Sequence, residues 1–262
     1  MRAAAGEARS LSIRVDGAAE GLSLDATATM ATGDVLGLTA KGSADLARRQ
    51  AAFASLKVSG LNTRWRLADD ARPRLEWTDT AVGVAVLALV DEAGGQQSAV
   101  LDGAWGDPAR PGLRLRLKGV RIEPFFAVGG SSPYGGELEA DALVSRGSGG
   151  DARVSADFTL RRGRVRRLPV QQTAGHIDYA GQMASLDVRL DQAPGAWLTA
   201  SGRVPVAAGA SASSGEELSL HVVSSPIGLG LLEGVSDLVK NVSGQMQLDV
   251  TALGTLRDPH FA

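Results

Sequence analysis

The chain contains no cysteine, which excludes disulfide bonds, thiolate metal sites and a cysteine nucleophile, and leaves the redox compartment open. Aromatic residues make up only 4 % of the sequence, so its core must be built mainly from Leu, Val and Ala. The formal net charge of -2 provides no positive field for displacing counterions from phosphates. Nucleic acid is therefore not an expected partner.

Long apolar segments are missing as well. The longest run extends from Ala81 to Val90, which is about half of the ~20 residues that a membrane-spanning helix needs. We therefore expect no membrane helix among these residues.

Catalytic motifs are equally scarce. The three histidines, His176, His221 and His260, are isolated and form neither H-x-x-x-H nor H-E-x-x-H, and no G-x-S-x-G elbow is present. Gly228-Leu229-Gly230 is similar to the start of a dinucleotide loop, but Glu233 stands at the third glycine position and would repel a pyrophosphate. We expect no enzyme activity, no metal and no cofactor; an enzyme of unfamiliar type, dependent on His176 or His221, is the third-ranked alternative.

What the sequence does contain is apolar residues in alternation. Leu11, Ile13 and Val15 alternate with polar residues, which is typical of a strand with one dry and one wet face. At least ten segments show this pattern, most of them ending at Gly or another turn residue: 11–15, 22–30, 36–40, 52–58, 113–117, 138–140, 154–160, 186–190, 218–222 and 246–250. The sequence predicts an all-β protein, with a long antiparallel meander in place of βαβ units.

Three segments depart from this pattern. Leu231, Val235, Leu238 and Val242 follow helical spacing and predict a short amphipathic helix near residues 229–242. Residues 147–150 and 207–215 consist of Gly, Ser and Ala and predict loops. The phrase G-x-x-x-D-P follows an apolar strand twice, at residues 103–108 and 254–259, and indicates repeated units of one design.

Two charged clusters are candidate binding groups. Glu137, Glu139 and Asp141 share one strand face and have the chemistry for Ca²⁺, but a solvated outer surface is the favoured interpretation. Five arginines around Gly163 are candidate contacts for anionic lipid headgroups, although an exposed hairpin is favoured over that role: Arg161, Arg162, Arg164, Arg166 and Arg167.

Two stretches of the sequence carry a family resemblance. The first consists of Asp157-Phe158-Thr159-Leu160, Gly163-Arg164-Val165, Leu168-Pro169-Val170, Gly175-His176-Ile177-Asp178-Tyr179, Leu186-Asp187-Val188-Arg189-Leu190 and Gly202-Arg203-Val204. The second joins the helical segment to Gly244-Gln245-Met246-Gln247-Leu248-Asp249-Val250 and Gly254-Thr255-Leu256-Arg257-Asp258-Pro259. These phrases resemble the repeat unit of the AsmA-like family over residues 113–262, and the second stretch is the more specific of the two.

The resemblance implies a fold, a location and partners. It implies a repeating β-groove, curled like a taco, that spans the bacterial periplasm and carries phospholipid between the inner and outer membranes. It also implies an inner-membrane anchor in the full-length protein and, as a partner, an outer-membrane β-barrel assembly protein. We expect one continuous elongated unit, a fragment of a longer protein, with an N-terminal groove segment at residues 1–112 and the family-like repeat at 113–262.

The expected mechanism is the shielding of acyl chains in this groove. A sheet with one apolar face gains about 25 cal/mol for each Å² that is covered, and small residues such as Ala140 and Ala156 leave room for ligand. The candidate lining residues are Leu113, Leu115, Leu117, Phe158, Leu160, Leu186, Val188, Leu190, Leu248 and Val250. The alternative function is a scaffold or chaperone that presents strand edges to an outer-membrane barrel protein during its assembly and secretion.

Overall fold

The computed structural model describes residues 8–18, 21–30, 35–94, 96–107, 109–127, 132–146, 150–166, 168–206, 217–228, 243–255 and 258–262. The chain forms two compact units, Met1–Val120 and Arg121–Ala262. In both units the described residues lie mostly in antiparallel strands, and the prediction of an all-β meander is confirmed.

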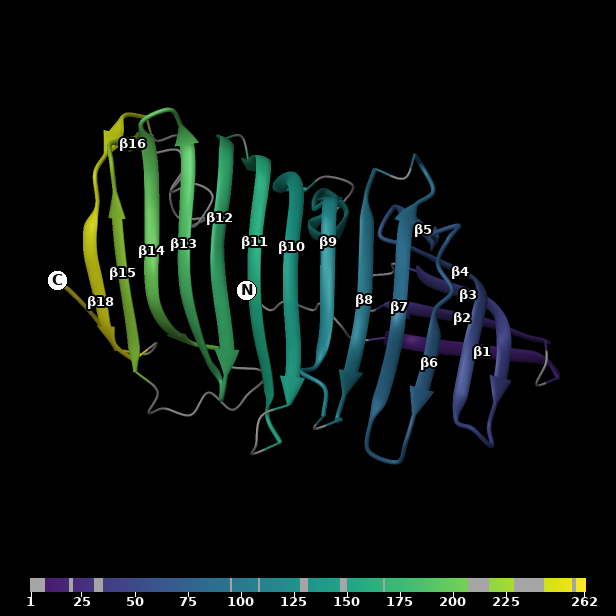
Figure 1. Ribbon diagram of the computed structural model, residues 1–262. Helices are drawn as coiled ribbons and strands as arrows, with labels where there is room; N and C mark the ends of the chain where they lie inside the picture. The colour runs from purple at the N-terminus through teal and green to yellow at the C-terminus, as the bar shows by residue number, and fades with distance from the viewer. Residues whose placement is uncertain are drawn as a thin grey trace. The chain divides into compact units, whose positions relative to one another are not determined.

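The first unit is a sheet in which successive strands pair with one another (Figure 1). Its strands are β1 (Ala8–Ala18), β2 (Gly21–Met30), β3 (Val35–Asp45), β4 (Gln50–Gly60), β5 (Thr63–Leu67), β6 (Arg74–Trp77), β7 (Val82–Asp91), β8 (Ser98–Trp105) and β9 (Leu113–Arg121). The first unit ends at Val120, whereas the sequence suggested a boundary after residue 112. Nearly all of β9 therefore belongs to the first unit.

One strand position of this unit is shared by two short segments. β5 and β6 both pair with β4 on one side and with β7 on the other. Between them, residues 68–73 leave the ladder, and Ala71 and Pro73 of this segment are buried. Ala71 packs with Ala40, Leu56 and Leu67 to form the core of the unit.

β4 contains a bulge that the sequence pattern did not reveal. Lys41 lies opposite Ser55, but the next residue, Gly42, lies opposite Phe53. The extra residue reverses the alternation, so Phe53 packs against the core while Ala52 and Ala54 are exposed. The prediction that Ala52 and Ala54 share the dry face of Leu56 and Val58 is wrong for this reason.

The second unit has the longer strands. They are β10 (Tyr134–Arg146), β11 (Ala152–Val165), β12 (Leu168–Ala180), β13 (Met183–Ala193), β14 (Ala196–Pro205), β15 (Leu218–Ser224), β18 (Asp249–Gly254) and β19 (Pro259–Phe261), preceded by a 3-10 turn at Glu123–Phe126. β10 to β15 lie side by side in chain order, and β18 pairs with β15 (Figure 1).

A small hairpin covers one end of the apolar side of this sheet. It is formed by β16 (Ile227–Gly228) and β17 (Gln245–Met246), and Ile227 is only 1 % exposed. Ile227 packs with Val170, Leu190, Leu198 and Met246. Residues 229–242, for which a helix is predicted, lie outside the described residues, as do 147–149 and 207–216.

The repeated G-x-x-x-D-P phrase begins at a glycine of the same backbone conformation in both places. Gly103 and Gly254 have φ angles of 111° and 101°. A Cβ at Gly103 would lie 2.1 Å from the carbonyl oxygen of Gly112, and one at Gly254 would lie 2.6 Å from that of Asp258. The phrase therefore marks a strand end where the returning chain approaches too closely for any side chain.

Candidate functional site

The second unit presents one continuous apolar face. Its central row crosses six strands through directly opposed residues: Phe158, Gly175, Val188, Ala200, Val222 and Val250. A flanking row joins Ala156, Ile177, Leu186, Gly202, Leu220 and Ala252. Since residues two apart on a strand share a face, both rows point to the same side.

A third row completes this face. It runs through Leu160, Thr173, Leu190, Leu198 and Ser224. Leu248 extends it, because its backbone N–H donates to the Ser224 hydroxyl (2.9 Å) and its carbonyl accepts from the Ser224 N–H (2.8 Å). The structure thus brings all seven predicted lining residues of this unit onto one face: Phe158, Leu160, Leu186, Val188, Leu190, Leu248 and Val250.

The degree of burial distinguishes this face from a closed core. All seven predicted residues are half-buried, although they belong to the apolar side of long central strands. In a closed two-layer interior, side chains at the centre of such rows are packed to crystal-like density and lose nearly all contact with water. The face therefore retains apolar surface that another molecule can cover.

The first unit has an apolar face of the same construction. Leu115 of β9 lies opposite Leu101, which lies opposite Leu87, and Leu117 connects in the same way through Ala99 to Leu89. Leu113 lies two residues from Leu115 and shares its face, opposite Gly103. Leu113, Leu115 and Leu117 are half-buried, whereas the intervening Arg114, Arg116 and Lys118 are exposed.

This face continues to β1, whose residues were not among the predicted lining residues. One row connects Ile13, Ala26, Leu38, Val58 and Trp65. Exposure falls along it, from 59 % at Ile13 to 8 % at Trp65. Leu11 and Val15 are 64 % and 58 % exposed. Their alternation was visible in the sequence, but which strands adjoin them was not.

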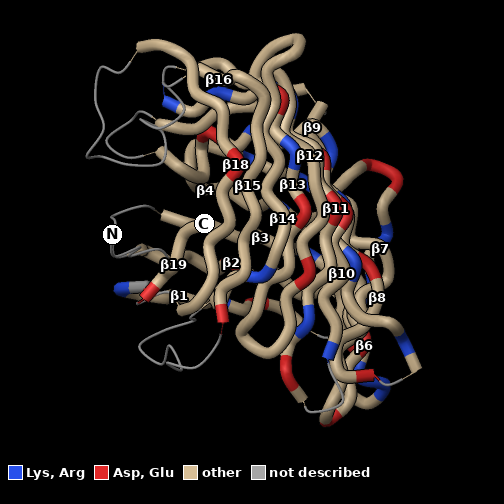
Figure 2. Tube along the Cα trace, turned by 90° about the vertical axis from the view of Figure 1, so that its left-hand side faces the viewer, with Lys and Arg blue, Asp and Glu red and all other residues tan. Residues whose placement is uncertain are grey.

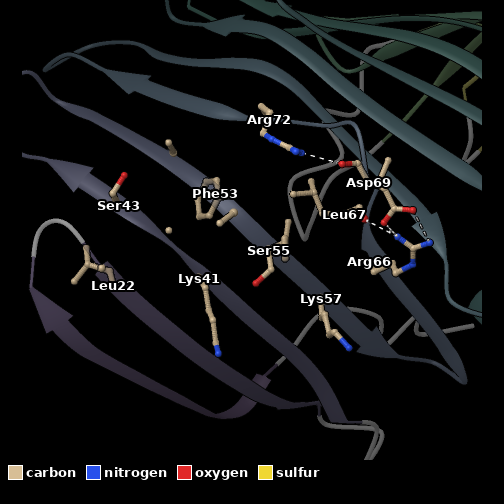
Figure 3. A pocket seen from close by; sticks show the side chains of 16 residues that line it. Leu22, Lys41, Ser43, Phe53, Ser55, Lys57, Arg66, Leu67, Asp69 and Arg72 are labelled. Atoms are coloured by element: carbon tan, nitrogen blue, oxygen red, sulfur yellow. Dashed lines mark hydrogen bonds and ion pairs between the residues drawn. The ribbon is translucent and has the colours of Figure 1, made fainter.

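A cavity of about 930 Å³ lies in the first unit (Figure 3). It is lined by Gly21, Leu22, Lys41, Gly42, Ser43, Ala52, Phe53, Ala54, Ser55, Leu56, Lys57, Arg66, Leu67, Ala68, Asp69 and Arg72. None of these residues was predicted as part of a site, because the bulge in β4 and the excursion at 68–73 that shape the cavity leave no mark in the alternation.

The polar face of the second unit carries interspersed acidic and basic positions along β11 to β14 (Figure 2). Arg161 pairs with Glu139 at 2.9 Å, and Arg162 pairs with Glu137. On the first unit, Arg116 pairs with Asp102 at 2.7 Å. In the described part of the chain, no group of three or more His, Asp or Glu side chains is arranged to hold a metal ion.

The predicted arginine cluster is largely engaged within the protein. Besides the two pairs with Glu139 and Glu137, Arg164 donates to the carbonyl oxygens of Arg166 (2.8 Å) and Ser132 (3.1 Å). Arg167 lies outside the described residues. Since the charges of Arg161 and Arg162 are compensated locally, these two have less capacity for headgroups than five unpaired cations would have.

His176 has polar neighbours that the sequence did not indicate. Its Nδ1 donates to Asp157 Oδ1 (2.8 Å) and its Nε2 to Asp178 Oδ2 (3.0 Å), with Ser155 Oγ 3.5 Å from Nε2. Hydrogen bonds to Asp157, and then to Asp178, raise the pKa of His176 above its usual 6.5. Hydrogen bonds from Ser155, and then from His176, lower the pKa of Asp178 below 3.8.

The contacts from Ser155 to His176 and from His176 to Asp157 are similar to those of a catalytic triad. The carboxylates around His176, however, oppose general-base catalysis by its imidazole. A general base needs a free nitrogen lone pair toward the hydroxyl. Here Nε2 is held by Asp178, and two carboxylates favour the imidazolium, which has no lone pair to accept the Ser155 proton. The arrangement is therefore an ion-pair cluster on an exposed sheet face.

The pKa shift of His176 predicts a pH dependence. Because its pKa is raised in the folded state, its stabilising contribution is complete below pH 6.5 and is lost as the pH rises through the raised value. The contribution of Asp178, whose pKa is lowered, is present above 3.8 and is lost as the pH falls through its lowered value.

NMR titration is expected to place the pKa of His176 above 6.5 in the native chain and closer to that value in Asp157→Asn. Asp141 and Asp187 lie opposite Asp157 and His176 on the adjacent strands, so Asp187→Asn is a useful second variant. An Asp157→Asn chain with an unchanged His176 titration would contradict the assigned cause.

Comparison with protein-family models, curated proteins and solved structures finds no match. Within the described ranges, no helix is long and apolar enough to cross a bilayer.

Proposed function

We propose that this chain is a non-enzymatic lipid-binding segment that shields phospholipid acyl chains on the apolar faces of its two β-units. The observation that supports this most is the set of half-buried rows across β11 to β18, which include Phe158, Val188, Val222 and Val250. A continuous apolar surface of this kind on a strand-rich protein marks a binding surface for an apolar partner.

The driving force is the removal of this surface from water. Each buried methylene contributes about 0.8 kcal/mol, so a long acyl chain gains several kcal/mol even when only part of it is covered. Gly175 and Ala200 flank Val188 in the central row, and Phe158 lies next to Gly175. Extended alkyl chains fit such a surface without a specific polar partner.

The family resemblance gives this binding a cellular role. The phrases at residues 157–204 and 231–259 resemble those of TamB, the translocation and assembly module subunit of the AsmA-like family. On this basis we propose that the chain belongs to a periplasmic, inner-membrane-anchored protein of the cell envelope that passes phospholipid between the two membranes. In this role it would contribute to outer-membrane biogenesis.

Lipid extraction tests the proposal directly. Purification of the chain from bacteria without detergent, followed by mass spectrometry of the organic extract, is expected to recover phospholipid in stoichiometric proportion. A cysteine-free globular protein of similar size, purified in parallel, serves as the control for carry-over.

The competing function is a scaffold that presents strand edges to an assembling outer-membrane barrel. A chain that carries no lipid, binds unfolded barrel protein in a pull-down experiment and slows the aggregation of that protein would favour the scaffold function. Absence of lipid from every preparation, together with no transfer between vesicles, would refute lipid shielding.

A further inference from the structure

The first strand of the first unit has an open edge. On one side β1 pairs with β2, in a register that is unbroken from Ser10 to Ala18. On its other side it pairs with no strand among the described residues, and it lies at the margin of the sheet in Figure 1. Alternate backbone N–H and C=O groups of β1 point to this open side, where a further strand can bind them.

The apolar side chains of β1 are more exposed than those of the strands beside it. Leu11, Ile13 and Val15 are 64 %, 59 % and 58 % exposed. The residues opposite them on β2 are half-buried, since β2 has a strand on each side. The excess exposure therefore belongs to the open edge, and side chains from a further strand would reduce it.

This edge lacks the devices that usually prevent strands from pairing. Such devices are Pro, Lys, bulges and charges on the inward side of an edge strand. Residues 10–17 contain neither Pro nor Lys, and their two charged side chains, Arg14 and Asp16, lie on the polar side, 3.5 Å from each other. The register shift of β1 lies at its beginning, between Ala8 and Ser10. Residues 10–17 thus form a regular strand that is open to pairing.

The sequence of β1 is complementary to its own inverted copy. Leu11 and Val15 lie two residues from Ile13 and share its face, whereas Ser12 and Arg14 lie on the other face. In an antiparallel pair of two β1 strands centred on Ile13, this residue lies opposite itself and Leu11 lies opposite Val15. Ser12 then lies opposite Arg14 on the polar side. All 11 residues of the strand take part in this register.

The two neighbouring registers on one side of this one are less favourable. A pair centred on Arg14 would place two guanidinium groups opposite each other, which is repulsive. A pair centred on the next residue would bring Arg14 opposite Asp16, but Ile13 would face Gly17 and only residues 12–18 would overlap. Because exposed ion pairs contribute little, the gain in charge pairing does not offset the lost apolar contacts.

We propose that the open edge of β1 binds the β1 strand of a second copy of this chain, antiparallel and centred on Ile13. The pair has two-fold symmetry and closes at two copies, because each copy contributes the same edge. One strand from each copy makes a small interface, so a dissociation constant on the order of tens of micromolar is expected. This association goes beyond the proposed lipid binding and does not depend on it.

Sedimentation velocity of the chain, stripped of lipid and measured at increasing concentration, tests the association. The native chain is expected to pass from monomer to dimer. Ile13→Asp places two carboxylates at the symmetry axis and is expected to raise the dissociation constant about tenfold or more. Val35→Asp is the matched control, because Val35 is 55 % exposed but lies on β3, which has a strand on each side. Its dissociation constant is expected to equal that of the native chain.

Single cysteines test the register, since the native chain contains none. Directly opposed residues of an antiparallel pair have Cα separations that a disulfide can bridge. Ile13→Cys is therefore expected to form a disulfide-linked dimer on mild oxidation. Leu11→Cys and Val15→Cys are each expected to stay largely unlinked alone and to form a mixed disulfide when the two variants are combined. Circular dichroism verifies that every variant keeps the β-fold.

The remaining outcomes separate this inference from the proposed function. A chain that stays monomeric at the highest concentration, or a dimer that Ile13→Asp leaves intact, would overturn the pairing of β1. Equal oxidation of all three cysteine variants would show contact without a defined register and would also overturn it. A dimer that forms only after lipid is added would show bridging by lipid, which contradicts strand pairing while lipid binding stands. A monomeric Ile13→Asp chain that still carries phospholipid would support the inference.

Discussion

Replacement of Val188 by Asp is expected to reduce lipid transfer between vesicles at least tenfold, because a carboxylate would then stand in the middle of the apolar row. Asp is close to Val in size, and the Val188 side chain is only half-buried. The cost of placing an acyl chain against an ionised carboxylate exceeds the gain from several methylenes. A fluorescence assay of lipid exchange between donor and acceptor vesicles measures the effect.

Ser219→Asp is the matched control for this substitution. Ser219 is exposed on the polar face of β15, opposite Arg203, so a new carboxylate there meets water and a cation. Its transfer rate is expected to equal that of the native chain. Because Val188 is only half-buried, both variants are expected to keep the native circular dichroism spectrum. A folded Val188→Asp chain that transfers lipid at the native rate would remove this face from the binding surface.

Gly202→Ala is expected to cause the largest loss of stability among single substitutions in the second unit. Gly202 has a φ angle of 145°, and a Cβ there would lie 2.0 Å from the carbonyl oxygen of Ser219. The β14–β15 pairing would have to separate near its Arg203–Ser219 end, with a cost of about 3 kcal/mol. Calorimetry is expected to record a fall in melting temperature of roughly 10 °C.

Gly181→Ala separates the two causes of this loss. Gly181 lies in the tight turn between β12 and β13 with a φ angle of 55°, and nothing lies within 4 Å of the position of a Cβ. An Ala at this position suffers only the left-handed conformation, about 1 kcal/mol. Equal destabilisation by the two substitutions would show that backbone conformation, and not the close approach of β15, governs Gly202.

The lining residues of the second unit were predictable because several sources of information agree there. Leu186, Val188 and Leu190 alternate with Ser185, Asp187 and Arg189, and the strands on both sides alternate in the same way. Once neighbouring strands pair in order, the phase of each alternation determines the face. These residues could therefore be predicted from the alternation of apolar and polar residues and from the expectation that successive strands pair in a meander.

The cavity of the first unit was not predictable by the same reasoning. It depends on the bulge that places Gly42 opposite Phe53 and on the departure of residues 68–73 from the ladder between β5 and β6. A bulge inserts one residue, and the residues after it point to the face opposite to the one that strict alternation predicts. A run such as Ala51-Ala52-Phe53-Ala54 does not show in the sequence which of its residues point to the apolar face. Only the partner strands decide which residue is the extra one.

The environment of the charged residues was hidden for a related reason. Asp157 and His176 are 19 residues apart, and Arg161 of β11 pairs with Glu139, its diagonal neighbour on β10. The sequence showed His176 as isolated and the arginines as a cluster. The register of β10, β11 and β12 reversed both descriptions, because cross-strand neighbours lie about 5 Å apart whatever their separation along the chain.

The sequence by itself determined the strand-rich class, the meander and the apolar side of most strands, since these follow from local alternation, turn residues and the lack of helical periodicity. Tertiary structure alone decided how much of each apolar side stays exposed, where bulges shift the phase, and which cations gather around a cavity. The reason is that exposure and charge pairing depend on neighbours brought by strand pairing and by chain excursions such as 68–73, and these contacts have no local signature in the chain.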